Sequence, residues 1–205
     1  MSAENDLFDP GTGRVCRGMM KQLLTARGQE AQMDRELVHA ELRQASATFH
    51  QLLESATAED LRRRSEGTRW TNEQLMYHMV FGYMVVRALL PMVRLFGRLP
   101  PGASRAWAWM LNAATRPFDV INYLGAVGGA RVYDHRRMGA KLDRTLAALH
   151  HRLDAETDAR LARTMGFPTR WDPFFRDVMT LEDVYRYPTQ HFDFHLAQLT
   201  VRAQG

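Results

Sequence analysis

The 205-residue sequence has a single cysteine, Cys16, and only two lysines, Lys21 and Lys141. One cysteine cannot form a disulfide within the chain, which favours a reducing compartment. Cys16 lies in a polar, glycine-rich stretch with no recognisable base near it, so a bystander thiol is preferred over a nucleophile. The first residues also lack the apolar core of a signal peptide. We therefore expect a cytoplasmic protein.

Long apolar runs are absent as well. Crossing a bilayer takes about 20 predominantly apolar residues, and the most apolar run here lies between Glu73 and Arg87. This run is predicted to be a buried helix of a soluble protein, so no membrane partner is expected.

Basic residues are not concentrated in one part of the chain. The formal net charge is +4, and the arginines are scattered, with small clusters at 62–64 and 136–137. A nucleic-acid binder usually gathers its basic residues on one face, with aromatic side chains between them. The cluster at 62–64 is better interpreted as a solvated helix end, which makes nucleic-acid binding the least favoured function.

Helical periodicity accounts for most of the chain. Apolar residues recur at three- and four-residue spacings, and Thr71 and Thr180 are placed as helix N-caps. Pro188 is expected to bend the last helix near its second turn. Four main helices are predicted, at about residues 32–55, 72–96, 134–156 and 181–201.

The segments between these helices are less regular. Residues 1–30 are predicted to be an N-terminal arm, which leaves a domain over 31–205. Two helical insertions are expected, at about 98–133, broken at Pro117 and Gly125, and at about 157–179. No window shows the alternation of a strand. The predicted fold class is all-α, a four-helix bundle with an arm and insertions.

Two histidines, His191 and His195, lie four residues apart in the stretch YPTQHFDFHLAQL. Residues at this spacing share a helix face, so the two imidazoles could ligate one metal ion. The pattern of polar residues directs this face inward. Buried imidazoles must stay neutral and either find hydrogen-bond partners or share a cation. Two polar side chains that merely share a face are the alternative.

A third candidate ligand, His78, lies in the most apolar helix. A histidine in a bundle core is costly unless it is hydrogen-bonded or ligated. Three neutral imidazoles from two facing helices would leave coordination positions open, which is typical of catalytic metal sites. The alternative is three unrelated core histidines, each satisfied by a backbone carbonyl or a tyrosine. The other five are predicted to be surface or structural residues: His39, His50, His135, His150 and His151.

Two segments resemble a known family. RWTNEQLMYHMV resembles the second helix of DinB-like (YfiT-like) four-helix-bundle proteins, in which a tryptophan precedes the cap and a metal-binding histidine follows. TLEDVYRYPTQHFDFHLAQL resembles the last helix of the family, with its threonine cap, H-x-x-x-H and glutamine. The matching positions are Trp70, Thr71 and His78 in the first segment, and Thr180, His191, His195 and Gln198 in the second.

The resemblance implies a bundle over about 32–201 that holds a divalent metal, zinc or nickel, through His78, His191 and His195. In part of this superfamily the metal activates the thiol of a small cofactor such as mycothiol or bacillithiol for transfer or isomerisation. The arginine excess is typical of a GC-rich genome, which would suit a mycothiol-using bacterium. Residues 98–133 exceed the minimal family pattern and could form a lid or a substrate wall.

Two functions follow as hypotheses. The first is a metal-dependent transferase, isomerase or hydrolase, without identified catalytic residues. Arginines at the cavity mouth, with Arg87 and Arg131 as candidates, would suit an anionic small-molecule substrate. Tyr77, Tyr185 or Tyr187 could supply a phenol for proton transfer. The alternative is a non-catalytic, stress-related bundle that binds a small ligand or forms a homodimer.

Overall fold

The computed structural model describes residues 34–201. The predicted arm at 1–30 and Cys16 lie outside the described residues. The chain divides into two compact units, 1–37 and 38–205, and the second unit contains the features described below.

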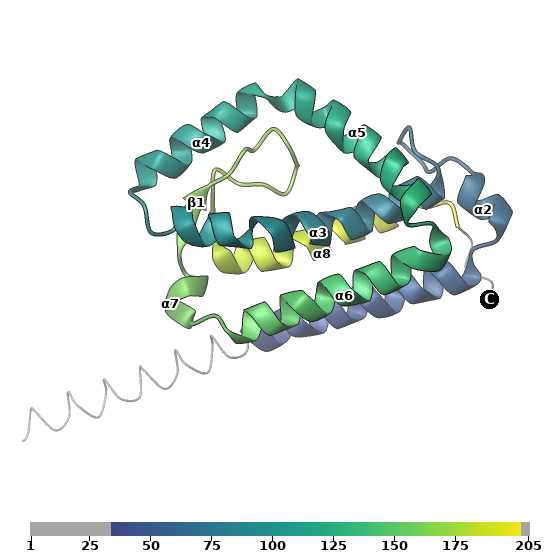
Figure 1. Ribbon diagram of the computed structural model, residues 1–205, viewed down its shortest axis with the longest axis horizontal. Helices are drawn as coiled ribbons and strands as arrows, with labels where there is room; N and C mark the ends of the chain where they lie inside the picture. The colour runs from purple at the N-terminus through teal and green to yellow at the C-terminus, as the bar shows by residue number, and fades with distance from the viewer. Residues whose placement is uncertain (1–33, 202–205) are drawn as a thin grey trace, which may run out of the picture. The chain divides into compact units, whose positions relative to one another are not determined.

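Four long helices form the second unit (Figure 1). They are α3 (Asn72–Phe96), α6 (His135–Asp154), α8 (Leu181–Leu196) and the helix described over residues 34–55, of which residues 38–55 belong to this unit. α3 contacts both α6 and α8. Side-chain hydrogen bonds from Ser46 and His50 to Asp143 join helix 34–55 to α6. The mostly helical fold predicted from the sequence is confirmed.

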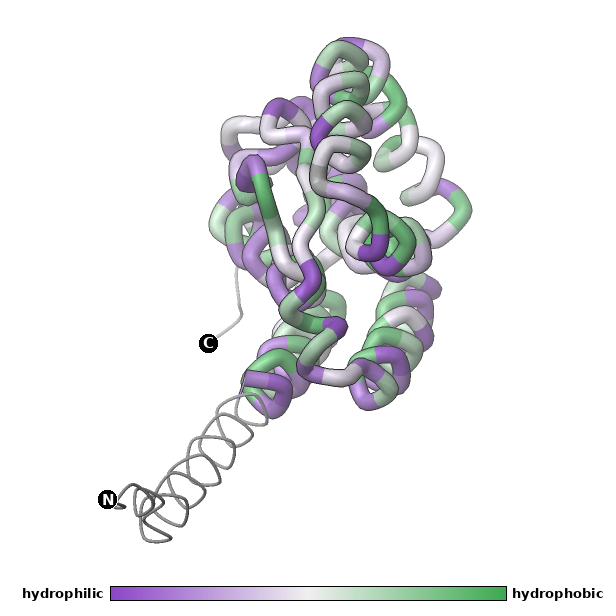
Figure 2. The backbone as a smooth tube through the Cα atoms, turned by 90° about the vertical axis from the view of Figure 1, so that its left-hand side faces the viewer, coloured by the Kyte–Doolittle hydropathy of each residue, from purple (hydrophilic) through white to green (hydrophobic). Residues whose placement is uncertain are grey.

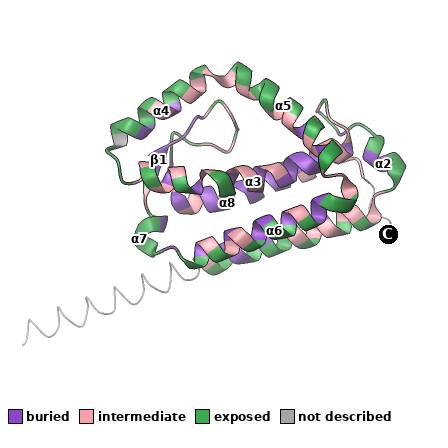
Figure 3. Cartoon of the chain, viewed as in Figure 1, coloured by how far each residue is buried: buried purple, intermediate pink, exposed green. Residues whose placement is uncertain are grey.

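Large side chains from all four helices fill the core of the bundle. Hydrophobic and hydrophilic residues alternate along the helices (Figure 2), and buried positions gather on α3 and α8 (Figure 3). Burying apolar surface is the main stabilising contribution to such a fold. The largest fully buried side chains are Tyr83, Tyr185, Phe49, Phe192, Leu42, Leu75, Met76, Met79, Leu90, Met138, Leu142 and Leu149.

The predicted helix starts on the two histidine-bearing helices are confirmed. Thr71 caps α3 and Thr180 caps α8, and each forms a reciprocal capping box with the residue three positions later. The box satisfies backbone donors that the first helical turn leaves free. α2 (Ala58–Arg62) begins in the same way, at Thr57. Local sequence therefore sets where α3 and α8 begin.

α8 is shorter than predicted and contains an internal proline. The helix ends at Leu196, earlier than the predicted 201. Pro188 lies inside a continuous helix, so it does not interrupt the path to His191. Proline removes one backbone donor, and this single loss is tolerated because the surrounding face of α8 is packed in the core.

Residues 98–133 form two helices, α4 (Pro101–Ala113) and α5 (Thr115–Val132). The predicted breaks at Pro117 and Gly125 are wrong, because the chain breaks once, at Ala114. Pro117 falls in the first turn of α5. Backbone N–H groups in a first turn make no hydrogen bond within the helix, so a proline there removes none. Gly125 is accommodated within the same helix at a modest cost in propensity.

The connection 157–179 contains a short helix and two short strands. These are α7 (Asp158–Leu161), β1 (Thr164–Gly166) and β2 (Val178–Thr180), with Met165 paired antiparallel to Met179. The prediction of a purely helical insertion is wrong here, because three-residue strands are too short to show alternation. The loop between the strands lies under α4 and α5 (Figure 1).

Polar and aromatic contacts fasten this loop to the insertion helices. Trp171 Nε1 donates to the carbonyl of Leu111 at 2.8 Å, and its ring stacks on Phe118 with centroids 4.0 Å apart. Gly166 N donates to Ser104 Oγ at 3.1 Å. The two insertions therefore form one structure beside α3.

Within residues 34–201, α3 is the one helix long and apolar enough to cross a membrane by length and composition, with 39% of its most apolar window buried. This is weak evidence for a membrane span, because the core helix of a soluble protein passes the same test. Here α3 packs against α5, α6 and α8.

Candidate metal centre

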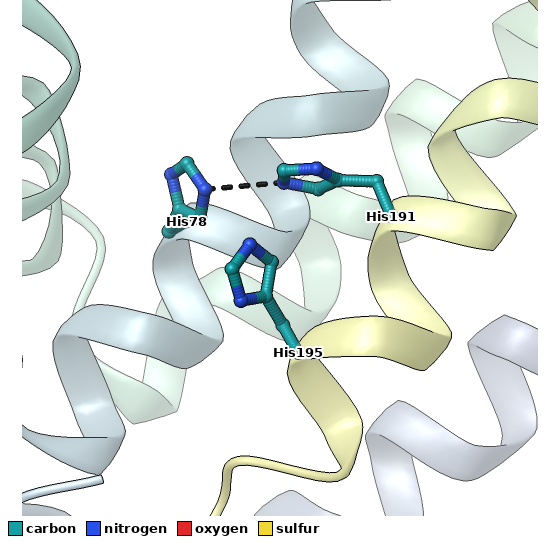
Figure 4. A group of neighbouring side chains, drawn as sticks. All are labelled: His78, His191 and His195. Atoms are coloured by element: carbon teal, nitrogen blue, oxygen red, sulfur yellow. Dashed lines mark hydrogen bonds between the residues drawn. The ribbon is translucent and has the colours of Figure 1, made fainter. Parts of the chain in front are cut away.

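α3 and α8 bring three histidines together inside the bundle (Figure 4). His78 comes from the middle of α3, and His191 and His195 come from successive turns of α8. Their exposed fractions are 4%, 6% and 8%. One nitrogen from each ring lies within 4.8 Å of the others. The convergence expected from the sequence is present, and the group could bind a metal ion.

Hydrogen bonds fix the tautomers of the two α8 imidazoles. His191 Nδ1 lies 2.8 Å from Asp172 Oδ2, and His195 Nδ1 lies 2.7 Å from Gln198 Oε1. A carboxylate or amide oxygen only accepts, so each Nδ1–H donates. The Nε2 atoms of the neutral rings are then unprotonated. This is the arrangement of a metal-binding histidine oriented by an outer hydrogen bond.

The third imidazole cannot satisfy both of these nitrogens. His78 Nε2 lies 3.1 Å from His191 Nε2, and the three donor atoms form one group. A neutral imidazole carries a single N–H, so His78 can donate to at most one of the two lone pairs that face it. A cation would satisfy all three nitrogens. The separation of 3.1 Å is close to the ~3.3 Å edge of a tetrahedron with zinc–nitrogen bonds of about 2.0 Å.

His78 is also held on its other side. Its ring stacks on Trp70, with centroids 4.5 Å apart, and its Nδ1 is buried without a hydrogen-bond partner. A buried polar atom without a partner destabilises the fold. A metal ion bound at Nε2 would leave this Nδ1 unchanged, so the fit of the donor set to a metal ion rests on the three nitrogens that face one another.

Burial keeps two of the three imidazoles neutral. It lowers the pKa of His78 well below the usual value, and the neighbouring His191 and His195 lower it further. Burial, and then His191, lower the pKa of His195 to about 4. Both imidazoles are therefore unprotonated at neutral pH, which is the form that binds metals.

Asp172 was not predicted from the sequence as a site residue. Its carboxylate also accepts from the Tyr187 hydroxyl at 2.9 Å and from Phe174 N at 2.9 Å. Burial acts to raise the pKa of Asp172, but the hydrogen bonds donated by His191, Phe174 N and Tyr187 hold it below the usual value. The carboxylate therefore stays ionised beside His191. The sequence offered one indication of a buried acid at this position, because Asp172 lies among aromatic residues in the stretch WDPFF.

An apolar cavity of about 250 Å³ opens beside two of the histidines. It lies between α3, the insertion helices α4 and α5, and the loop that follows β1. Its polar lining groups include His78, Asn122, Asp172, Tyr187 and His191, and the rest is apolar or aromatic: Phe81, Gly82, Val85, Leu89, Met92, Trp107, Leu111, Phe118, Met165, Gly166, Phe167, Pro168, Trp171 and Phe175.

The arginines and tyrosines suggested by the sequence as accessory residues do not all line this cavity. Arg87 and Arg131 are exposed and do not line this cavity. Of the tyrosines, Tyr187 lines it, and its hydroxyl donates to Asp172. Burial, followed by the charge of Asp172, raises the pKa of Tyr187. Tyr77 instead packs against Phe81 and Tyr133, and the Tyr185 hydroxyl lies 3.4 Å from Glu156.

Four of the remaining histidines make structural contacts. His39 Nδ1 lies 2.6 Å from His150 Nδ1, and His39 Nε2 lies 2.9 Å from Asp154. His50 contacts Asp143, and His135 contacts Glu73. None of them joins the metal-type cluster found in residues 34–201.

Fold and site together define a helical bundle with a buried three-histidine cluster that could hold a metal. The family model of the DinB superfamily matches residues 41–199, so the chain belongs to this superfamily. Comparison with curated proteins and with solved structures gave no significant match.

Proposed function

We propose that this protein is a metal-dependent enzyme in which His78, His191 and His195 hold one divalent ion, zinc or nickel. The observation that carries the proposal is the shortage of protons in the buried cluster. Two unprotonated nitrogens face a third that can donate only once. Three protein ligands would leave coordination positions for reactants, which is typical of catalytic sites.

The chain's own groups would hold the ligands in place. Asp172 keeps the proton of His191 on Nδ1, and Gln198 does the same for His195. Trp70 covers the ring of His78 and limits the entry of water from that side. When bound, a divalent ion would lower the pKa of a thiol or water and so supply a nucleophile near neutral pH.

A low-molecular-weight thiol such as mycothiol is the proposed co-reactant, in a transfer or isomerisation. The chain's single cysteine, Cys16, lies outside the described residues. Residues 34–201 supply no thiol, and the proposal takes the thiol nucleophile from a second molecule. Simple hydrolysis by an activated water is the remaining reaction class.

The cavity favours an uncharged, apolar substrate group over the anionic substrate expected from the sequence. Its lining includes no arginine or lysine, and most of it is aromatic or aliphatic. An apolar cavity of about 150 Å³ holds a benzene molecule, so about 250 Å³ suits one substituted or two fused rings. The substrate would present its apolar part to the cavity and its reactive part to His78 and His191.

Metal analysis of protein purified without a histidine tag tests the proposal. We expect about one equivalent of zinc or nickel per chain, at least tenfold less in His195→Ala, and no change in His151→Ala, which removes an exposed histidine. Absence of stoichiometric metal, with no difference between the two variants, would remove the proposal.

The same cavity supports a second candidate, a non-catalytic bundle that binds a small apolar ligand. The two functions differ in turnover. Loaded protein incubated with a small thiol and aromatic electrophiles should consume the thiol if it is an enzyme, and His195→Ala should not. Saturable binding of the aromatic compound without turnover, in metal-loaded protein, would favour the second candidate.

A further inference from the structure

A second cavity, of about 210 Å³, is lined by four arginines. Arg94 and Arg98 come from the last turn of α3 and the residues after it, Arg160 comes from α7, and Arg163 follows α7. We call this cavity the arginine pocket. Its other lining residues are Val93, Ala155 and Leu181, so no acidic side chain from residues 34–201 lines it.

Positive charge is in excess in the arginine pocket. Arg94 is paired with the buried Glu156, with Nε donating to Oε1 at 2.7 Å. Within residues 34–201, no salt bridge or side-chain hydrogen bond joins the other three arginines to an acid. Like charges gathered in a concavity attract counter-ions strongly.

Parts of the pocket are fixed before any ligand arrives. The Arg163 carbonyl accepts from Leu181 N at 2.9 Å, which ties the residue to the start of α8. The side chain of Arg163 passes close to Gly97, where an added Cβ would lie 3.1 Å from the Arg163 Cβ. Glu156 holds the guanidinium of Arg94. A pre-organised site loses less entropy on binding.

We propose that the arginine pocket binds a compact, multiply charged oxyanion of the phosphate type, either free or as the phosphate group of a small molecule. Planar guanidinium groups pair bidentately with phosphate oxygens. The pocket is separate from the histidine cluster, because His78 and Arg94 are about 24 Å apart along α3 at 1.5 Å per residue. The proposal therefore does not depend on the proposed enzyme activity.

Binding of inorganic phosphate and pyrophosphate is measured by calorimetry and by thermal unfolding, at constant ionic strength set with sodium chloride. We expect saturable binding, tighter for pyrophosphate, and an increase in Tm that chloride does not reproduce. In Arg160→Gln/Arg163→Gln, affinity should fall at least tenfold. Neither side chain forms an ion pair with an acid among residues 34–201, and glutamine keeps the methylene groups near Gly97, so the fold should survive.

Two further variants make the result specific. Arg62→Gln/Arg64→Gln removes the same charge from exposed positions outside the pocket and should bind pyrophosphate like the wild type. Arg160→Lys/Arg163→Lys keeps the charge but loses the planar forks, so its affinity should be intermediate. Equal loss in the Arg62/Arg64 variant, no loss in the Arg160/Arg163 variant, or no saturable binding by the wild type would each overturn the proposal. A methyl phosphate ester that binds as well as phosphate would identify an esterified ligand as the natural class, and exclusion of the ester would identify the free anion.

Discussion

At the scale of single residues, Asp172 has the largest effect on the candidate metal centre without belonging to it. Its oxygens accept from His191, Tyr187 and the backbone of Phe174. A carboxylate behind a ligating histidine fixes the tautomer and raises the basicity of the ring. Removing its charge should therefore weaken the metal site and leave all three histidines in place.

Asp172→Asn is expected to lower metal affinity by about 10- to 100-fold, the usual effect of losing such an outer partner. Competition with a chromogenic chelator measures the change. Asparagine keeps the size of the side chain, so circular dichroism should remain that of the wild type.

Two further variants test whether the loss of metal affinity in Asp172→Asn is specific to this carboxylate. Asp177→Asn removes an exposed acid from the same loop and should leave the affinity unchanged. Tyr187→Phe removes one donor to Asp172 without altering its charge, and should have a smaller effect than Asp172→Asn. Wild-type affinity in Asp172→Asn would contradict the assigned role.

At the scale of helices, α3 and α5 approach closely at one glycine. A Cβ placed on Gly129 would lie 2.0 Å from Tyr77 Cε1 and 2.2 Å from its Cζ. Gly128, the preceding residue on the same helix, has nothing within 4 Å of such an atom. The Tyr77 ring therefore packs directly on the backbone of α5, beside His78 on α3.

Gly129→Ala should destabilise the fold by about 1–3 kcal/mol, the typical cost of overpacking a well-packed contact. Gly128→Ala should stabilise it by about 0.5–1 kcal/mol, because alanine favours the helix. Chemical denaturation of both variants measures the free energy of unfolding. Similar values for the two would mean that α5 does not approach Tyr77 as closely as the structure shows.

At the scale of the whole molecule, features set by residues close together in the sequence were predictable, and features set by contacts between distant residues were not. α3 and α8 were predictable because the capping boxes at Thr71 and Thr180 and the helical periodicity are local. The meeting of His78 with His191 followed from burying both faces in one bundle. Asp172 and the pairing of β1 with β2 were not predictable from local pattern, because both depend on contacts made only after the connection folds over α3.

The placement of charged side chains in the folded molecule also cannot be read from the composition of the chain. The cavity beside the histidines is apolar and extends along α3 from His78 to Met92, and the arginine pocket begins at Val93, near the C-terminal end of the same helix. The sequence suggested arginines and substrate at one site. Chain folding places the arginine pocket apart from the histidines instead, so the proposed apolar ligand and the proposed oxyanion would occupy different sites.

The pH dependence of unfolding reports on a second histidine contact, between helix 34–55 and α6. His39 Nε2 faces Asp154, so its Nδ1 accepts the proton donated by His150 Nδ1. Burial, followed by His39 and Arg43, lowers the pKa of His150, while Asp154 opposes this shift. In the unfolded chain the imidazole has an ordinary pKa of about 6.5.

The unfolded chain therefore takes up this proton at a higher pH than the folded protein does. The contribution of His150 to the free energy of unfolding is fully present above about pH 6.5 and is lost as the pH decreases below that value. In His150→Asn this contribution is absent, so the free energy of unfolding should fall less steeply over the same range. The histidine cluster is common to both proteins, so the difference between their curves isolates His150. His151→Asn, at the exposed neighbouring position, should keep the wild-type slope, and parallel curves for wild type and His150→Asn would show that the contact with His39 does not set the pH response.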